Sequence, residues 1–124
     1  MSTVVLVAED DAFLGETICL GLQERGVEAH LVRDGDEAVA FIDRRQPDLL
    51  LLDLVMPRRD GYSVLQHIRT KQYAFPVIIL SNLSNDLTPE KCRELHAKDY
   101  VVKSDIDEDE LWPKISKYLP STSA

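Results

Sequence analysis

Four of the five short apolar runs in this 124-residue sequence end in side chains that can do chemistry. The residues at these ends are Glu9-Asp10-Asp11, Asp53, Ser81 and Lys103. Short apolar runs are typical of buried parallel strands, whose carboxyl ends meet at the edge of the sheet where ligands of open α/β sheets bind. The pattern therefore predicts a small cleft that holds carboxylates, a hydroxyl and an ammonium group.

The carboxylates of this predicted cleft outnumber its cation. Glu9, Asp10 and Asp53 bring about three negative charges against one from Lys103, an excess that favours a hard divalent cation held by oxygens. Mg²⁺ suits the cleft because it uses one or two carboxylates and leaves positions for water and phosphate oxygens. An Asp beside Mg²⁺ can attack phosphorus to give an acyl phosphate, while Lys103 and the Ser81 hydroxyl hold the other phosphoryl oxygens.

Each of these residues also has an ordinary structural interpretation. A lone Asp or Ser after a strand is usually a turn former or helix cap, and a lone Lys there is usually solvated. An acidic pair after a first strand is more often a solvated loop than a metal site. The conjunction of four strand ends is what favours the chemical interpretation.

The elements that must position these residues follow from the hydrophobic pattern. The runs that predict strands are 4–8, 29–32, 49–52, 77–80 and 100–102. Helix-period stripes lie between or after them, at Leu14, Ile18 and Leu22, at Ala38, Phe41 and Ile42, at Val64, Leu65 and Ile68, and at Leu111, Ile115, Tyr118 and Leu119. Gly26, Gly35, Asp60-Gly61 and Thr88-Pro89 mark helix ends and starts. This alternation predicts an α/β fold, a (βα)₅ doubly wound five-stranded parallel sheet with helices on both faces.

Charge and composition narrow the function classes. A formal net charge of −8 disfavours direct binding of nucleic acid. No apolar run approaches the ~20 residues of a membrane span, and no basic region precedes the first apolar run as in a signal peptide. Cys19 and Cys92 lie inside predicted helices and are expected to be free thiols rather than a disulfide or metal pair. We therefore expect a cytoplasmic protein without direct nucleic-acid or membrane contact.

Three motifs resemble those of response regulator receiver domains, including the single-domain chemotaxis type. They are Val7-Ala8-Glu9-Asp10-Asp11, Leu52-Asp53-Leu54-Val55-Met56-Pro57 running into Asp60-Gly61, and Tyr100-Val101-Val102-Lys103. The resemblance covers residues 3–119 and is specific because the three motifs occur together. It implies the flavodoxin-like strand order 2-1-3-4-5, with a domain at residues 1–119 and a flexible tail or start of a linker at 120–124.

The resemblance implies a metal-dependent phosphoacceptor. Asp53 would accept the phosphoryl group. Glu9, Asp10, Asp53 and the backbone carbonyl of Val55 would be the ligands of Mg²⁺, for which Mn²⁺ can substitute. Lys103 would pair with the phosphoryl group.

The resemblance also implies a switch. Ser81 would move toward the phosphoryl group, and Tyr100 matches the aromatic position that turns inward, although it can also be read as a half-buried strand residue. The face built by the fourth helix, the fifth strand and the fifth helix would change. Its implied partners are a sensor histidine kinase, a phosphotransfer protein or a small phosphodonor, a downstream protein target or output domain, and a second copy of the chain through that face. Such a domain catalyses only its own phosphorylation and dephosphorylation and is not an enzyme with a separate substrate.

Several positions near the cleft depart from the family pattern. Ser104 replaces the usual proline, which leaves a differently shaped trans loop or an unusual cis bond as alternatives. Asn82 replaces a very small residue and could crowd the phosphoryl group or hydrogen-bond to it. Val55 and Leu83 are apolar where family members can orient the attacking water, so we expect slow loss of the phosphoryl group.

Two helices also depart from the pattern. His96 stands where a glycine usually ends the fourth helix, at a place that favours a positive φ. Pro113 falls inside the last helical stripe, where it would cost about 3 kcal/mol, so we expect the helix to begin near Trp112.

Three other functions compete with this hypothesis. Haloacid-dehalogenase-like phosphatases also use an aspartyl nucleophile, but they usually carry a second Asp at the position that Val55 occupies here. A degenerate receiver would bind partners without phosphorylation, an alternative that Ser104 and Asn82 keep open. A flavin-binding protein of the same fold class is disfavoured because no phosphate-binding loop follows the first strand.

Overall fold

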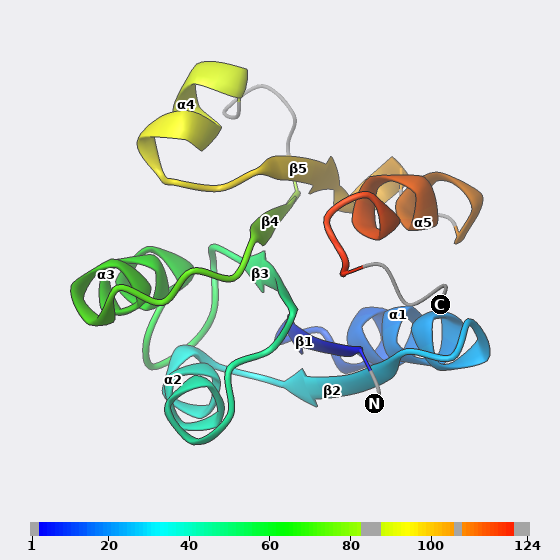
Figure 1. Ribbon diagram of the computed structural model, residues 1–124, viewed down its shortest axis with the longest axis horizontal. Helices are drawn as coiled ribbons and strands as arrows, with labels where there is room; N and C mark the ends of the chain where they lie inside the picture. The colour runs from blue at the N-terminus through cyan, green and yellow to red at the C-terminus, as the bar shows by residue number, and fades with distance from the viewer. Residues whose placement is uncertain (1–2, 83–87, 106–107, 121–124) are drawn as a thin grey trace.

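A computed structural model describes residues 3–82, 88–105 and 108–120. Five parallel strands form one sheet in the order β2-β1-β3-β4-β5 (Figure 1). The strands are β1 (Val4–Ala8), β2 (Glu28–Val32), β3 (Leu49–Asp53), β4 (Val77–Ser81) and β5 (Asp99–Val102). The helices are α1 (Ala12–Glu24), α2 (Gly35–Arg44), α3 (Gly61–Lys71), α4 (Pro89–Glu94) and α5 (Glu108–Ser116), with a 3₁₀ turn at Lys103–Asp105. The expected fold class and strand order are confirmed.

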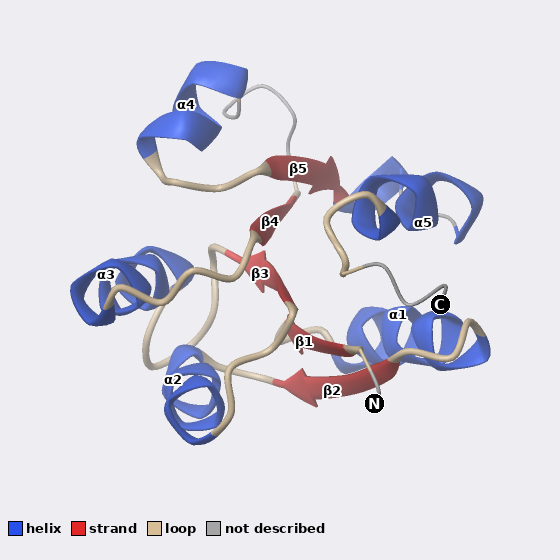
Figure 2. Cartoon of the chain, viewed as in Figure 1, coloured by secondary structure: helices blue, strands red, loops and turns tan. Residues whose placement is uncertain are grey.

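Helices cover both faces of the sheet, with α1 and α5 on one side and α2 and α3 on the other (Figure 2). The alternation of β1 shows the two cores. Leu6 and Ala8 pack with buried side chains of α2, α3 and α4, whereas Val5 and Val7 pack with those of α1 and α5. Because both faces are covered, the three central strands β1, β3 and β4 are continuous apolar runs rather than alternating ones, up to the polar residue that ends β3 or β4.

Side-chain caps start four of the helices, in the connections that follow β1, β2, β3 and β4. Asp11, Asp34, Asp60 and Thr88 each accept a hydrogen bond from the backbone N–H three residues later. Such caps satisfy donors that the first helical turn leaves unpaired. The polar residues at the strand ends therefore serve two purposes, since some start helices and others line the cleft.

Helix ends mostly follow the expected signals. Gly26 has φ +84° just after α1, and His96 has φ +63° just after α4, which confirms that His96 occupies a glycine-type position. Arg58 and Gln72 also have left-handed conformations, with φ of 64° and 60°, and neither was predicted.

The expected start of the last helix was wrong. The helix α5 begins at Glu108 and contains Pro113 in its interior. Leu111 and Ile115 anchor the helix on both sides of the proline with buried side chains. Packing therefore offsets the hydrogen bond that the proline removes. The helix also ends before Tyr118 in the expected stripe.

The two cysteines are buried and free, as expected. Cys19 belongs to the core beneath α1 and α5, and Cys92 belongs to the core on the opposite face. Among the described residues, no helix combines the length and the apolar character needed to cross a membrane.

Candidate functional site

The register of the sheet brings the predicted residues to one edge. Asp53, the last residue of β3, lies beside Leu80, and Ser81, the last residue of β4, lies beside Val102. Glu9 continues from β1, where its N–H donates to the carbonyl of Val32 at 3.0 Å. The strand ends therefore converge as the parallel topology requires.

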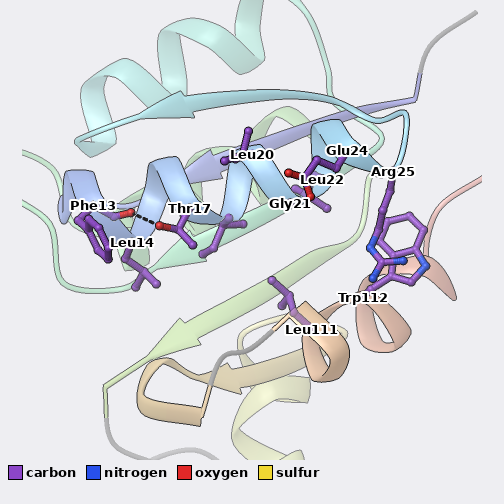
Figure 3. Close-up of a pocket in the computed structure, with 11 residues that line it drawn as sticks. Phe13, Leu14, Thr17, Leu20, Gly21, Leu22, Glu24, Arg25, Leu111 and Trp112 are labelled. Carbon is purple, nitrogen blue, oxygen red and sulfur yellow. Dashed lines mark hydrogen bonds between the residues drawn. The ribbon is translucent and has the colours of Figure 1, made fainter.

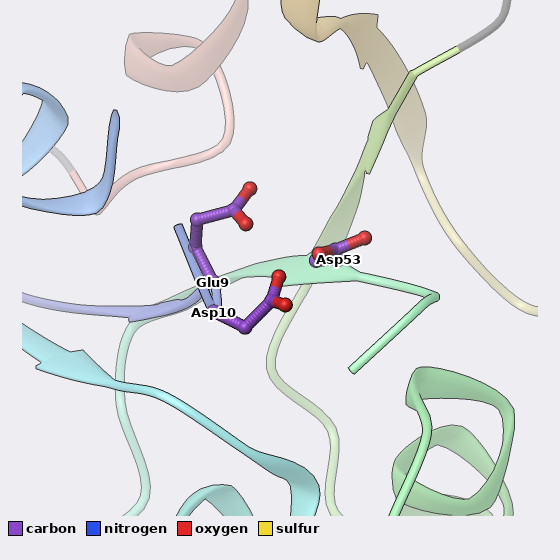
Figure 4. Close-up of side chains that lie close together, drawn as sticks. All are labelled: Glu9, Asp10 and Asp53. Atoms are coloured by element: carbon purple, nitrogen blue, oxygen red, sulfur yellow. The ribbon is translucent and has the colours of Figure 1, made fainter. Parts of the chain in front are cut away.

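Three carboxylates gather at this edge. Glu9, Asp10 and Asp53 each offer an oxygen within 4.8 Å of the others. Figure 4 shows the three side chains at the ends of β1 and β3. Glu9 is 0% exposed and Asp53 3%, whereas Asp10 is exposed. Two of the carboxylates are thus buried inside the fold and the third borders solvent.

Lys103 is the cation of the cluster. Its Nζ lies 2.6 Å from Glu9 Oε1 and 2.9 Å from Asp53 Oδ2, and only 11% of its side chain is exposed. The described residues contain no cis peptide bond, so the Lys103–Ser104 bond is trans. Of the two alternatives for this loop, the trans loop is the one observed. In this loop the Lys103 ammonium contacts the carboxylates of both Glu9 and Asp53.

Burial controls the ionisation of the cluster. It raises the pKa of Glu9 to about 7, against the lowering effects of Lys103 and of the Asp11 N–H that donates to Glu9 Oε2. Burial also raises the pKa of Asp53, although the hydrogen bond from Lys103 opposes it. Burial acts to lower the pKa of Lys103, but its bonds to Glu9 and Asp53 outweigh this effect and raise it. The single ammonium group of Lys103 therefore faces three carboxylates, and a bound cation would help to neutralise them.

This donor set fits Mg²⁺. Mg²⁺ prefers oxygen ligands, and three carboxylate oxygens lie close enough to share one ion. The N–H of Val55 donates to Asp53 Oδ1 at 3.0 Å, which holds the start of the following loop beside the carboxylates. The use of the Val55 carbonyl as a ligand stays a prediction.

The residues expected to act as a switch lie on two neighbouring strands, Ser81 on β4 and Tyr100 on β5. Ser81 is half-buried at the end of β4, and Asn82 is exposed. Tyr100 is half-buried against the core that α2, α3 and α4 cover. Lys114 of α5 donates to the Tyr100 carbonyl at 3.0 Å and sits 5.6 Å from the centre of its ring. Leu83 lies outside the described residues.

A polar group beside the cluster was missed by sequence reasoning. Asp34 is only 2% exposed, and its Oδ2 lies 2.6 Å from Nη1 of Arg58. Arg33 donates to the carbonyl of Asp10 at 3.4 Å. The Asp34-Gly35 pair at a helix start could have indicated a cap, but nothing in the sequence indicates a pairing with Arg58.

An apolar hollow lies away from the carboxyl edge of the sheet. It has a volume of about 350 Å³ between α1 and α5, where Phe13, Leu20, Leu111 and Trp112 are among the lining side chains (Figure 3). Phe13 and Leu20 are strongly exposed. The lining includes none of the ionisable residues at the carboxyl edge, so this hollow is separate from the carboxylate cluster.

Comparisons with known proteins agree with this geometry. The sequence matches the response regulator receiver domain over residues 5–116. It is 32% identical to the receiver domain of the Francisella response regulator 1452, with a TM-score of 0.82 over 94% of this chain and 96% of that one. It is 28% identical to the signal receiver domain of a Vibrio parahaemolyticus protein that is described as a putative LuxO repressor. The TM-score for this pair is 0.86, over 95% of this chain and 90% of that one. It is also 28% identical to the BeF3-activated receiver domain of RstA from Klebsiella pneumoniae, with a TM-score of 0.85 over 96% and 100%.

The family match spans nearly the whole sequence and includes every residue of the carboxylate cluster. Receiver domains are signalling domains rather than enzymes with a separate substrate, and they bind Mg²⁺ at an acidic pocket. The chain therefore belongs to the response regulator receiver domain family of two-component signalling.

Proposed function

We propose that Asp53 accepts a phosphoryl group in a Mg²⁺-dependent reaction that the domain itself promotes. The observation that carries this proposal is the position of the Lys103 ammonium, which contacts Asp53 and Glu9 together beside the exposed carboxylate of Asp10. A phosphoryl group on Asp53 would thus be formed next to a fixed cation and next to oxygen ligands for a metal ion.

The residues of the cluster divide the work. A carboxylate oxygen of Asp53 forms the new bond to phosphorus while the bond between phosphorus and the donor breaks, and that electron pair leaves with the donor. Lys103 neutralises charge on the phosphoryl oxygens, and Glu9 and Asp10 hold Mg²⁺ with Asp53 and the Val55 carbonyl. Bound Mg²⁺, or Mn²⁺ in its place, supplies further neutralisation of phosphoryl charge.

The response to phosphorylation would pass through Ser81 and Tyr100. Ser81 moves its hydroxyl toward the phosphoryl group, Tyr100 turns inward, and the face of α4, β5 and α5 changes. The donor is a histidine kinase, a phosphotransfer protein or a small phosphodonor. The changed face binds a downstream target, an output domain or a second copy of the chain. We place this activity in the cytoplasm, in a domain of residues 1–119 with a flexible tail or linker start at 120–124.

The proposal can be tested by mass. The protein is incubated with phosphoramidate or acetyl phosphate, with Mg²⁺ or with a chelator, and its intact mass is compared with that of Asp53→Asn. We expect the gain of one phosphoryl group that requires Mg²⁺ and is absent from the variant. No gain in a protein that still binds Mg²⁺ would support a degenerate receiver that binds partners without phosphorylation.

A further inference from the structure

The loop after Asp53, residues 54–60, is closed by two short hydrogen bonds, one to the Asp53 side chain and one within the backbone. Val55 N–H donates to Asp53 Oδ1 at 3.0 Å, and Gly61 N–H donates to the Leu54 carbonyl at 2.9 Å. The loop carries the Val55 carbonyl, which we propose as a ligand of Mg²⁺. The position of that ligand therefore depends on what holds the loop from outside.

Arg58 connects this loop to the start of α2. It has a φ of 64°, a conformation that is uncommon for residues other than glycine. In this conformation its Nη1 lies 2.6 Å from Asp34 Oδ2. The Asp34 side chain is 3% exposed, while that of Arg58 is 70% exposed. The buried carboxylate thus receives its charged partner from the loop.

Asp34 is itself firmly placed. Its Oδ1 accepts the N–H of Glu37 at 2.8 Å as the cap of α2. The next residue, Gly35, packs so closely on the loop that a Cβ there would clash with the Arg59 carbonyl. Two residues before Asp34, the Val32 carbonyl accepts the N–H of Glu9 at 3.0 Å. The connection from β2 to α2 therefore contacts both segments that carry the proposed metal ligands.

A neighbouring ion pair provides a matched comparison. Arg59 Nε lies 3.3 Å from Asp36 Oδ1 and joins the same loop to the same helix. Its side chains are 37% and 57% exposed, so solvent screens the attraction. The two consecutive arginines thus differ in whether their carboxylate partner is buried.

We propose that Arg58 is a positioning residue for the Mg²⁺ site. Its ion pair with Asp34 fixes the loop after Asp53 and, through the loop, the Val55 carbonyl. Partners outside the ligand shell that orient metal ligands commonly change metal affinity, although they never touch the ion. The inference rests on the proposed binding of Mg²⁺ and adds a residue that the family motifs do not include.

The test measures Mg²⁺ dissociation constants by isothermal titration calorimetry for the wild type, Arg58→Ala, Arg58→Lys, Asp34→Asn and the control Arg59→Ala. We expect Arg58→Ala to weaken Mg²⁺ binding about tenfold. Arg59→Ala should change it less than about twofold because its pair is exposed. Arg58→Lys should recover most of the affinity, since it restores the charge opposite Asp34. The double variant of Arg58→Ala with Asp34→Asn should bind Mg²⁺ no more weakly than Arg58→Ala alone, because both changes remove the same contact.

A metal-free measurement separates positioning from general stability. Hydrogen exchange of the Val55 amide should be faster in Arg58→Ala than in Arg59→Ala, whereas exchange at Leu51 in the centre of β3 should match between the two. If Arg58→Ala unfolds more easily yet binds Mg²⁺ as tightly as the wild type, Arg58 is only a structural residue and the inference fails. If Arg58→Ala does not fold, Arg58→Gln replaces it in both measurements. A wild-type protein that binds no Mg²⁺ would instead overturn the metal site and the inference with it.

Discussion

The substitution Glu9→Gln measures how much the buried, ionised carboxylate of Glu9 lowers the free energy of unfolding. Glu9 is 0% exposed, and burial raises its pKa from 4.5 to about 7. The folded chain therefore keeps a proton on Glu9 at pH values where the unfolded chain has lost it. By linkage, the free energy of unfolding must fall as the pH rises between these two values. Glutamine carries no charge at either pH and removes this dependence.

The size of the effect follows from the shift of the pKa. Each unit corresponds to about 1.4 kcal/mol, so a shift from 4.5 to about 7 costs roughly 3 kcal/mol above neutral pH. Glutamine keeps an oxygen that can accept the Asp11 N–H, and Lys103 keeps its contact with Asp53. We therefore expect Glu9→Gln to be more stable than the wild type by up to about 3 kcal/mol in metal-free solution near pH 8, and about equal to it near pH 4.

Urea unfolding with a chelator at the two pH values measures this difference, with Glu16→Gln on the exposed surface of α1 as the control. Saturating Mg²⁺ should then stabilise the wild type, by about 3 kcal/mol at a hundred times its dissociation constant, and Glu9→Gln less. The reasoning is wrong if Glu9→Gln is no more stable than the wild type in the chelator near pH 8. It is also wrong if Glu16→Gln gives the same gain.

Three further substitutions probe the same edge of the sheet. Lys103→Met leaves two buried carboxylates without their cation and should destabilise the metal-free protein by about 3–5 kcal/mol in urea unfolding, with part of the loss recovered in Mg²⁺. Gly61→Ala would place a Cβ 2.5 Å from the Asp53 carbonyl oxygen, so thermal unfolding should show a loss of about 1–3 kcal/mol; an unchanged melting temperature would contradict this packing. The Val55 side chain is 72% exposed and cannot orient water by hydrogen bonding, so Val55→Asn should shorten the lifetime of the phosphoryl group on Asp53, followed by the decay of the phosphorylated mass. A lifetime in the wild type as short as that of the variant would refute the expected slow loss.

The pattern of apolar runs in the sequence was enough to place the ionisable and hydroxyl residues of the site at one edge of the sheet. Short apolar runs located the strands to within a residue. The parallel topology then required Asp53, Ser81 and Lys103, which lie at or just after strand ends, to meet at one edge of the sheet. Local signals such as Thr88-Pro89 and Gly26 also predicted helix boundaries, because capping and positive φ depend on only a few neighbouring residues.

Packing decided what local patterns could not. Pro113 stands inside α5 despite its local cost, because buried contacts on both sides of it hold the helix. The hydrogen bond between Lys103 and Asp53 joins residues 50 positions apart, and the ion pair between Arg58 and Asp34 joins residues 24 apart. The hydrophobic periodicity of the sequence does not show which side chains that far apart along the chain will form a contact.

The sequence by itself thus determined the fold class, the strand ends and the kinds of residue that meet there. Only the tertiary structure decided that Glu9 is fully buried, that Lys103 contacts two carboxylates and that Arg58 pairs with the buried Asp34. The physical reason is that backbone preferences act between near neighbours, whereas burial and ionisation depend on the whole chain once it has packed.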